Sequence, residues 1–219
     1  MKNEQPDTRI GVLIPAYREA DHIAEVVKGA RQCCATVVVV DDGSDDDTAR
    51  VAGEAGAGVV RLEQNQGKGA ALSRGFEEMR SRGMEAVIAM DADGQHDPRD
   101  LPRFLEAYRR TGIPVLIGNR MAGVRNMPPI RRWTNRVMSW MLARIMQQYV
   151  PDTQCGFRLY RCDILPFVQA ASGRFAAESE VLLNIAARGI RMDNVHIRTI
   201  YAREASSIHP VVDTYRFLA

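Results

Sequence analysis

The stretch Ala86-Val87-Ile88-Ala89-Met90-Asp91-Ala92-Asp93-Gly94-Gln95-His96-Asp97-Pro98 decides the fold, because an apolar run in it gives way to a polar turn. The run over residues 86–90 is bounded by turn-forming residues and predicts a buried strand. Alternate side chains of a strand lie on the same side of a sheet. We therefore expect Asp91 and Asp93 to lie together at the end of this strand, with Gln95 in the same phase.

This turn has two interpretations. Carboxylate and amide oxygens such as those of Asp91, Asp93 and Gln95 are ligands that suit Mg²⁺ or Mn²⁺, so the stretch predicts a divalent metal site. Alternatively, it is a polar loop that only caps the next helix, with Asp97 as the N-cap and Pro98 in the first turn. The stretch alone does not decide between the two.

Composition limits the class of protein. A chain of 219 residues with 46% hydrophobic residues can build a sizeable core, which favours one domain over residues 1–219. The formal net charge of +2 gives no reason to expect a nucleic-acid partner. The four cysteines form no zinc-like pair, and Cys33 and Cys34 are adjacent, which is typical of reduced thiols in the cytosol.

Membrane segments are not expected. Residues 1–9 are polar and lack the apolar core of a signal peptide, and no apolar run approaches the roughly 20 residues that span a bilayer. We expect a cytoplasmic protein that is soluble or, at most, peripheral on the inner face of the membrane.

Strands and helices alternate along the first half of the chain. Apolar runs predict strands over residues 10–14, 36–40, 59–62, 86–90 and 114–118, and helical patterns lie between them. This order is typical of an α/β fold with a mainly parallel central sheet flanked by helices. Ligands of such sheets collect at the carboxyl ends of the strands.

Polar clusters follow several of these strands directly. They cover residues 15–19, 41–44, 91–95 and 119–120. Because parallel strands end at one edge, we expect all four clusters to meet there, which favours a binding site over a simple loop.

Two further segments suggest contacts with a nucleotide. Asp41 and Asp42 end a strand, where carboxylates commonly hold ribose hydroxyls or base N–H groups. The alternative is that this segment caps the next helix through Ser44 or Asp45, and both can be true at once. The glycine-rich residues 65–72, with Lys68, are similar to a phosphate cradle but lack the full P-loop pattern, so a plain tight turn is the alternative.

The second half, residues 119–219, differs in character. We expect an irregular loop over residues 121–129, a helix over residues 130–149, a short strand over residues 156–160, a helix that contains residues 178–183, and a strand over residues 192–197.

The motifs together resemble a known family. Ile14-Pro15-Ala16-Tyr17-Arg18-Glu19, Val40-Asp41-Asp42-Gly43-Ser44, Gly67-Lys68-Gly69, Met90-Asp91-Ala92-Asp93-Gly94-Gln95-His96 and Asp152-Thr153-Gln154-Cys155-Gly156-Phe157-Arg158 occur in the order of family-two glycosyltransferases. The resemblance covers residues 10–210 and is closest to dolichyl-phosphate mannosyltransferase and the polyprenyl-phosphate glycosyltransferases. It implies a GT-A fold, a GDP- or UDP-linked sugar donor, Mg²⁺ or Mn²⁺, and inversion at the anomeric carbon.

The resemblance also implies roles for individual residues. The nucleotide-sugar positions, with Lys68 added from the phosphate-like turn, are Pro15, Tyr17, Glu19, Asp41, Asp42, Lys68 and Asp91. The metal positions are Asp91, Asp93 and Gln95. Arg120, Arg131 and Arg132 are the candidates for holding an acceptor phosphate, which arginine can bind bidentately. Arg203 and Ser206 are candidate contacts of the donor diphosphate.

The chain departs from the family pattern at two points. Glu204 and Ala205 replace the usual residues of the late loop, which puts the closing of this loop in doubt. The chain also carries no C-terminal membrane helices, so membrane contact would rest on the helix near residues 133–149, whose tryptophans and methionines suit a lipid interface. A core or homodimer helix is the alternative, and it is the interpretation that we favour.

The acceptor determines the chemistry. A lipid phosphate attacks through an anionic oxygen and needs no general base, whereas a hydroxyl acceptor needs one, for which Asp152 is the first candidate and Glu178 or Glu180 the next. A nucleotidyltransferase is disfavoured because residues 15–19 are not its glycine-rich, arginine-containing phosphate loop. A non-catalytic nucleotide-sugar-binding protein is a further alternative.

Overall fold

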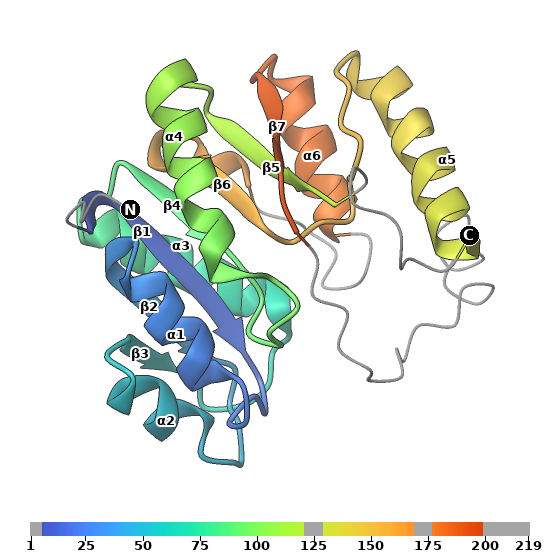
Figure 1. Ribbon diagram of the computed structural model, residues 1–219. Coiled ribbons are helices and arrows are strands. Elements are labelled where there is room, and N and C mark those ends of the chain that lie inside the picture. Colours follow the sequence, from blue (N-terminus) through green and yellow to red (C-terminus); the bar gives the residue numbers. More distant parts are fainter. Residues whose placement is uncertain (1–5, 121–128, 169–176, 199–219) are drawn as a thin grey trace.

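A seven-stranded sheet in the order β3-β2-β1-β4-β6-β5-β7 forms the centre of the protein (Figure 1). The computed structural model describes residues 6–120, 129–168 and 177–198, without the side chains of residues 129–136, 138 and 177–179. The strands are β1 (Asp7–Ala16), β2 (Cys34–Asp41), β3 (Gly58–Arg61), β4 (Ala86–Ala89), β5 (Val115–Asn119), β6 (Arg158–Arg161) and β7 (Met192–His196). The α-helices are α1 (Ile23–Arg31), α2 (Thr48–Glu54), α3 (Lys68–Ser81), α4 (Leu101–Thr111), α5 (Pro129–Met146) and α6 (Ala177–Ala187). Two 3₁₀ helices, η1 (Pro98–Asp100) and η3 (Cys162–Phe167), complete the described elements.

The sheet is mixed, with one antiparallel strand. β1 runs parallel to β2 and β4, β2 to β3, and β5 to β7. β6 lies between β4 and β5 and runs antiparallel to both. The predicted α/β fold with a mainly parallel sheet is therefore confirmed, and the segment that precedes β6 lies at the edge where β4 and β5 end.

Helices cover both faces of this sheet. α1, α2 and α4 contact it from one side, and η1 contacts α1 and α4. α3 packs on β1, β2 and β4 and also contacts η3, which in turn contacts α6 (Figure 1). Covered on both faces, β2 is apolar without alternation, and Val37 to Val40 are each no more than 2% exposed.

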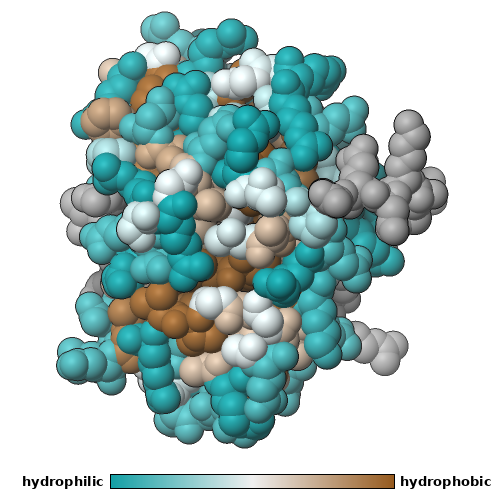
Figure 2. All heavy atoms as spheres, turned by 90° about the vertical axis from the view of Figure 1, so that its left-hand side faces the viewer, coloured by the Kyte–Doolittle hydropathy of each residue, from teal (hydrophilic) through white to brown (hydrophobic). Residues whose placement is uncertain are grey.

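The covering helices are amphipathic. In α4 the buried residues Leu101, Phe104, Leu105 and Tyr108 follow the spacing of one helical face. Figure 2 shows the side on which α1, α2 and α4 lie: hydrophilic residues predominate there, and hydrophobic ones form smaller patches between them. The helices thus bury one face each and leave a polar surface.

α5 lies at the outer edge of the molecule and packs against α6 (Figure 1). Trp140, one of the tryptophans of this helix, is not on its buried side: Trp140 is 60% and Ile145 67% exposed, whereas Leu142 and Met146 are buried. A membrane or homodimer contact through this exposed face stays a prediction. None of the helices within the described ranges is long and apolar enough to cross a bilayer.

Asp7 fastens the start of β1 to the end of α4, and its loss should destabilise the fold. The carboxylate is 6% exposed, accepts from the backbone N–H groups of Arg9 (2.8 Å) and Ile10 (3.0 Å), and pairs with Nη2 of Arg109 at 2.6 Å. Burial alone would raise the pKa of Asp7, but the hydrogen bonds from Arg109 and the backbone outweigh it and lower the pKa.

We therefore expect Asp7→Ala to lower the free energy of unfolding by about 2 kcal/mol at pH 7, as for other hydrogen bonds to a charged acceptor. Because the folded pKa lies below the unfolded one, this stabilisation is present above about pH 4 and is lost as the pH falls through the folded pKa. Urea unfolding at pH 7 and pH 3 measures it. A difference between wild type and variant that does not shrink at pH 3 would contradict the assignment to the ionised carboxylate.

Candidate active site

The polar clusters predicted from the sequence meet at one edge of the sheet. β1, β2, β4 and β5 end there, and their registers align Ala16 with Asp41 and Ala89 with Arg158. Because β6 is antiparallel, residues 152–157 arrive at the same edge from the second half of the chain. The edge therefore combines segments from both halves.

The loops after β1 and β2 are bonded to each other. The backbone N–H groups of Arg18 and Glu19 donate to the hydroxyls of Ser44 (3.0 Å) and Thr48 (2.8 Å). Arg18 has a left-handed backbone (φ 58°), a conformation that costs energy for a non-glycine residue and is common at functional sites. Pro15 is buried in β1, while Tyr17 follows it and is 39% exposed.

Asp41 and Asp42 are buried and hold loops in place. Asp42 is 3% exposed, and its two oxygens accept from the backbone N–H groups of Gln66 (2.8 Å) and Gly67 (2.7 Å). Asp41 is 0% exposed and accepts from the backbone N–H of Ser44 at 3.1 Å, while Nε of Arg61 lies 3.3 Å from its other oxygen. A carboxylate at position 42 thus fixes the glycine-rich turn.

This turn places Lys68 next to Asp91, the first carboxylate of the predicted metal motif. Gly67 has φ 91°, a backbone that favours glycine, and precedes the first residue of α3, which is Lys68. Nζ of Lys68 lies 2.6 Å from Oδ1 of Asp91. A chain of contacts therefore runs from Asp42 through the turn and Lys68 to Asp91.

The Asp91 segment is not part of the strand. β4 ends at Ala89, so the alternation of side chains expected for Asp91, Asp93 and Gln95 does not extend to them. Instead, the segment bends: the backbone N–H of Asp91 donates to Nδ1 of His96 (3.0 Å), and that of Gln95 donates to Oδ1 of Asp93 (3.0 Å). The predicted N-cap is confirmed, since Asp97 accepts from the backbone N–H of Arg99 at 3.0 Å.

Burial and nearby charges at this edge of the sheet shift the pKa values of Asp91 and His96. Burial, the largest single influence, would raise the pKa of Asp91, but the charge of Lys68, its hydrogen bond and the charge of Arg120 act together in the opposite direction and lower the pKa below its usual range. Burial lowers the pKa of His96, against the opposing charge of Asp91. The His96 ring is therefore neutral near pH 7, with Nδ1 as an acceptor, and it packs against Phe157 with centroids 5.1 Å apart.

The oxygen atoms of Asp91, Asp93 and Gln95 suit a divalent cation whose remaining ligands are phosphate oxygens. Asp91 is 28% exposed and Asp93 is partly exposed, so both carboxylates are accessible, and Gln95 is exposed. Among the described residues, no group of three or more His, Cys, Asp or Glu side chains could hold a metal alone. Mg²⁺ is commonly bound by one or two carboxylates together with substrate phosphates, which is the case these residues would meet.

Arg120 and Asp152 form a buried ion pair beside this segment. Nε and Nη2 of Arg120 donate to Oδ2 (2.7 Å) and Oδ1 (2.9 Å) of Asp152, and the backbone N–H of Arg120 also reaches Oδ2 at 3.3 Å. The Asp152 side chain is 0% exposed and that of Arg120 is 20% exposed. The carboxylate therefore holds the guanidinium, part of which remains accessible.

The loop before β6 is braced from within. Arg158 is 3% exposed and donates to the carbonyl oxygens of Cys155 (2.6 Å) and Thr153 (2.8 Å). A Cβ at Gly156 would lie 3.0 Å from both Oδ2 of Asp91 and Nζ of Lys68, so only glycine lets this loop approach that pair without displacing it.

The sequence interpretation missed several of these roles. It gave no part to Arg158, to the hydroxyl of Thr48, or to Gly156 as a spacer, and it considered Ser44 only as a cap of the next helix. Their only signal was membership in the quoted motifs or their flanks. The side chains of Arg131 and Arg132, as well as Arg203 and Ser206, lie outside the described residues, so their predicted roles stay predictions.

Comparison with known proteins identifies the family. The family model described as "Glycosyl transferase family 2" matches residues 11–167. The chain belongs to this family. The predicted resemblance to family-two glycosyltransferases is thereby confirmed. The matched segment extends from β1 to the end of η3.

Individual relatives agree with this assignment. The uncharacterized protein MJ1222 of Methanocaldococcus jannaschii is 30% identical over 94% of this chain and 87% of its own length. Undecaprenyl-phosphate 4-deoxy-4-formamido-L-arabinose transferase of Pseudomonas aeruginosa is 30% identical over 91% of this chain, which spans 59% of that protein.

A solved structure confirms the GT-A fold of this family-two transferase. Glucosyl-3-phosphoglycerate synthase from Mycobacterium tuberculosis, in complex with Mn²⁺, UDP and glucosyl-3-phosphoglycerate, superposes with a TM-score of 0.69. The two are 23% identical, and the match covers 95% of this chain and 75% of that one.

Proposed function

We propose that this family-two glycosyltransferase moves a sugar from a GDP- or UDP-linked donor to a polyprenyl phosphate, with inversion and with Mg²⁺ or Mn²⁺. The observation that carries the proposal is that one edge of the sheet carries both an accessible Asp91 carboxylate and a partly exposed Arg120 guanidinium, which Asp152 holds in place. One binds cations and the other binds anions. Relatives that act on undecaprenyl phosphate support the acceptor.

The donor would bind across the loops after β1 and β2. Tyr17 is exposed beside the backbone fixed by Ser44 and Thr48, and Asp42 holds the turn from which Lys68 projects. The amine of Lys68 and the carboxylates of Asp91 and Asp93 suit the diphosphate end. A bound divalent cation would neutralise charge that grows on the departing nucleoside diphosphate. The Mn²⁺ and UDP of the superposed synthase support this assignment.

The transfer exchanges one bond for another. An anionic oxygen of the acceptor phosphate forms a bond to the anomeric carbon, while the bond from that carbon to the donor's β-phosphate oxygen breaks. Attack opposite the leaving group inverts the carbon, and the electron pair leaves with the nucleoside diphosphate. No proton needs to move, so the protein contributes positioning and electrostatics.

The surroundings of Asp152 bear on whether the acceptor is a hydroxyl or a phosphate. A general base for a hydroxyl must lie within hydrogen-bond reach of it. The Asp152 carboxylate is 0% exposed and both oxygens accept from Arg120, which favours a positioning role for Asp152. This arrangement supports an anionic acceptor over a hydroxyl.

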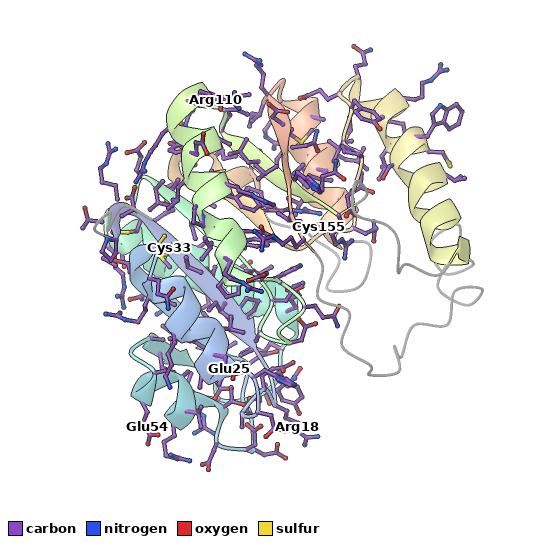
Figure 3. All side chains as sticks on the ribbon, in the orientation of Figure 1. Arg18, Glu25, Cys33, Glu54, Arg110 and Cys155 are labelled. Atoms are coloured by element: carbon purple, nitrogen blue, oxygen red, sulfur yellow. The ribbon has the colours of Figure 1, made fainter. Side chains whose placement is uncertain are left out.

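A panel of labelled nucleotide sugars, assayed with and without polyprenyl phosphate and with Mn²⁺, Mg²⁺ or a chelator, tests the proposal. We expect transfer from one GDP- or UDP-sugar to the lipid, and none with the chelator. Arg110→Ala serves as a control for a change of surface charge and should transfer sugar like the wild type, because Arg110 is exposed near the end of α4, away from Cys155 (Figure 3). Transfer only to a soluble hydroxyl acceptor would refute the lipid-phosphate assignment.

A further inference from the structure

A cation of the protein itself already lies where a metal would bind. Nζ of Lys68 is 2.6 Å from Oδ1 of Asp91, the first carboxylate of the metal motif. A Mg²⁺ ion lies about 2.0–2.1 Å from a carboxylate oxygen. A metal ion on either oxygen of the Asp91 carboxylate would lie close to the Lys68 ammonium group and be repelled by it, so metal binding to Asp91 competes with Lys68.

The fold places the start of the Lys68 side chain, and the end of this side chain is partly exposed. Asp42 fixes the backbone N–H of Gly67, the residue before it, so its Cα has a defined position. The Lys68 side chain is 43% exposed, and four methylenes separate its amine from that Cα. The amine can therefore exchange one anionic partner for another without movement of the turn.

The absence of a side chain at Gly156 leaves the space that the Lys68–Asp91 ion pair occupies. A Cβ there would come within 3.0 Å of Nζ of Lys68 and of Oδ2 of Asp91. The pair is thus enclosed on one side by the loop before β6 and is accessible from the other.

We propose that Lys68 is an internal counter-cation of Asp91 that weakens metal binding until the donor diphosphate draws the lysine away. This inference rests on the proposed function, since it assigns an order to the ligands of that site. Diphosphate oxygens offer the ammonium group a second anion, and Asp91 is then released to the metal. Metal and nucleotide must then bind cooperatively, and each must tighten the other equally.

Titration of the full chain with Mn²⁺, followed by the electron paramagnetic resonance signal of the free ion, tests this. Without nucleotide, we expect Lys68→Met to bind Mn²⁺ on the order of tenfold more tightly than wild type. Lys68→Arg keeps the cation and should resemble wild type. Lys28→Met, on the exposed side of α1, is the matched control and should leave the affinity unchanged.

The second measurement repeats the titration with UDP or GDP. Wild type should gain Mn²⁺ affinity with its nucleotide, and Lys68→Met should gain less, because its carboxylate is already released. Lys68→Met should remain folded, since loss of a cation at the first position of a helix removes an unfavourable dipole interaction. Lys68→Gln provides a second variant of similar length.

The outcomes separate this inference from the proposed function. If wild type binds Mn²⁺ with nucleotide but Lys68→Met binds the metal alone no more tightly than wild type does, the counter-cation role is overturned and the proposed function stands. If no variant binds Mn²⁺ under any condition, both are overturned.

Discussion

Replacing Asp91 by asparagine is expected to lower the rate of sugar transfer on the order of 10²- to 10³-fold, the effect of removing one preorganised electrostatic contact. The Asp91 carboxylate is partly exposed and pairs with Lys68, while its backbone N–H donates to the neutral His96, so Asp91 combines accessibility with a fixed backbone. The amide of asparagine keeps the shape but not the charge that a divalent cation requires. Initial rates over a range of Mn²⁺ concentrations measure the effect, and excess Mn²⁺ should restore only a fraction of it.

The control for this variant is Asp163→Asn. Asp163 is 59% exposed and pairs with Arg161 at 2.7 Å, and such exposed pairs contribute little to stability. It should retain the wild-type rate. The Asp91 variant should also unfold at nearly the wild-type temperature, because the backbone N–H of residue 91 can still donate to His96. An Asp91→Asn enzyme with the full rate would remove Asp91 from the metal site.

The sequence predicted the strands well because their signal is local. The runs expected over residues 36–40 and 114–118 became β2 and β5 with shifts of one or two residues. β1 starts at Asp7 rather than near residue 10, because Asp7 pairs with Cys34 and with Arg109. These partners lie 27 and 102 residues away, which no local pattern records.

The direction of β6 lay beyond the sequence for the same reason. Residues 156–160 were expected to form a strand, but nothing in their pattern states that it inserts between β4 and β5 in reverse. That reversal brings Asp152 and Gly156 to the site edge. Short-range patterns predict elements, whereas pairing between distant strands is determined by the whole core.

The sequence predicted where the polar clusters meet, but not which hydrogen bonds and ion pairs their side chains form. The meeting of the clusters after β1, β2, β4 and β5 at one edge follows from parallel strands, and the structure has it. The partners of each charge are different from those expected: Asp42 binds the turn at Gly67, and Asp91 binds Lys68. Such contacts depend on short distances between atoms of segments that are far apart in the chain, which no local sequence pattern determines.

Asp152→Asn is expected to lower the rate of transfer to the lipid phosphate on the order of 10²-fold, as misplacement of a reactant by about 1 Å does. The carboxylate would no longer hold Arg120 through two charged hydrogen bonds of 2.7 and 2.9 Å. The free energy of unfolding should fall by about 2–3 kcal/mol. This is at or below the cost of breaking a fully buried ion pair, because Arg120 keeps some contact with solvent. Steady-state kinetics should show a rise of KM for the lipid phosphate larger than that for the nucleotide sugar.

A double-mutant cycle separates positioning from base catalysis. If Asp152 acts through Arg120, the effects of Asp152→Asn and Arg120→Gln on the rate should not add, because the second substitution removes what the first one misplaces. A base would give additive effects and would also shift the acid limb of the pH–rate profile. Additive losses together with such a shift would therefore return Asp152 to the role of base and the acceptor to a hydroxyl. Non-additive losses with an unchanged pH profile would place the two residues in one anion-binding unit, with the buried carboxylate orienting the guanidinium that meets the acceptor.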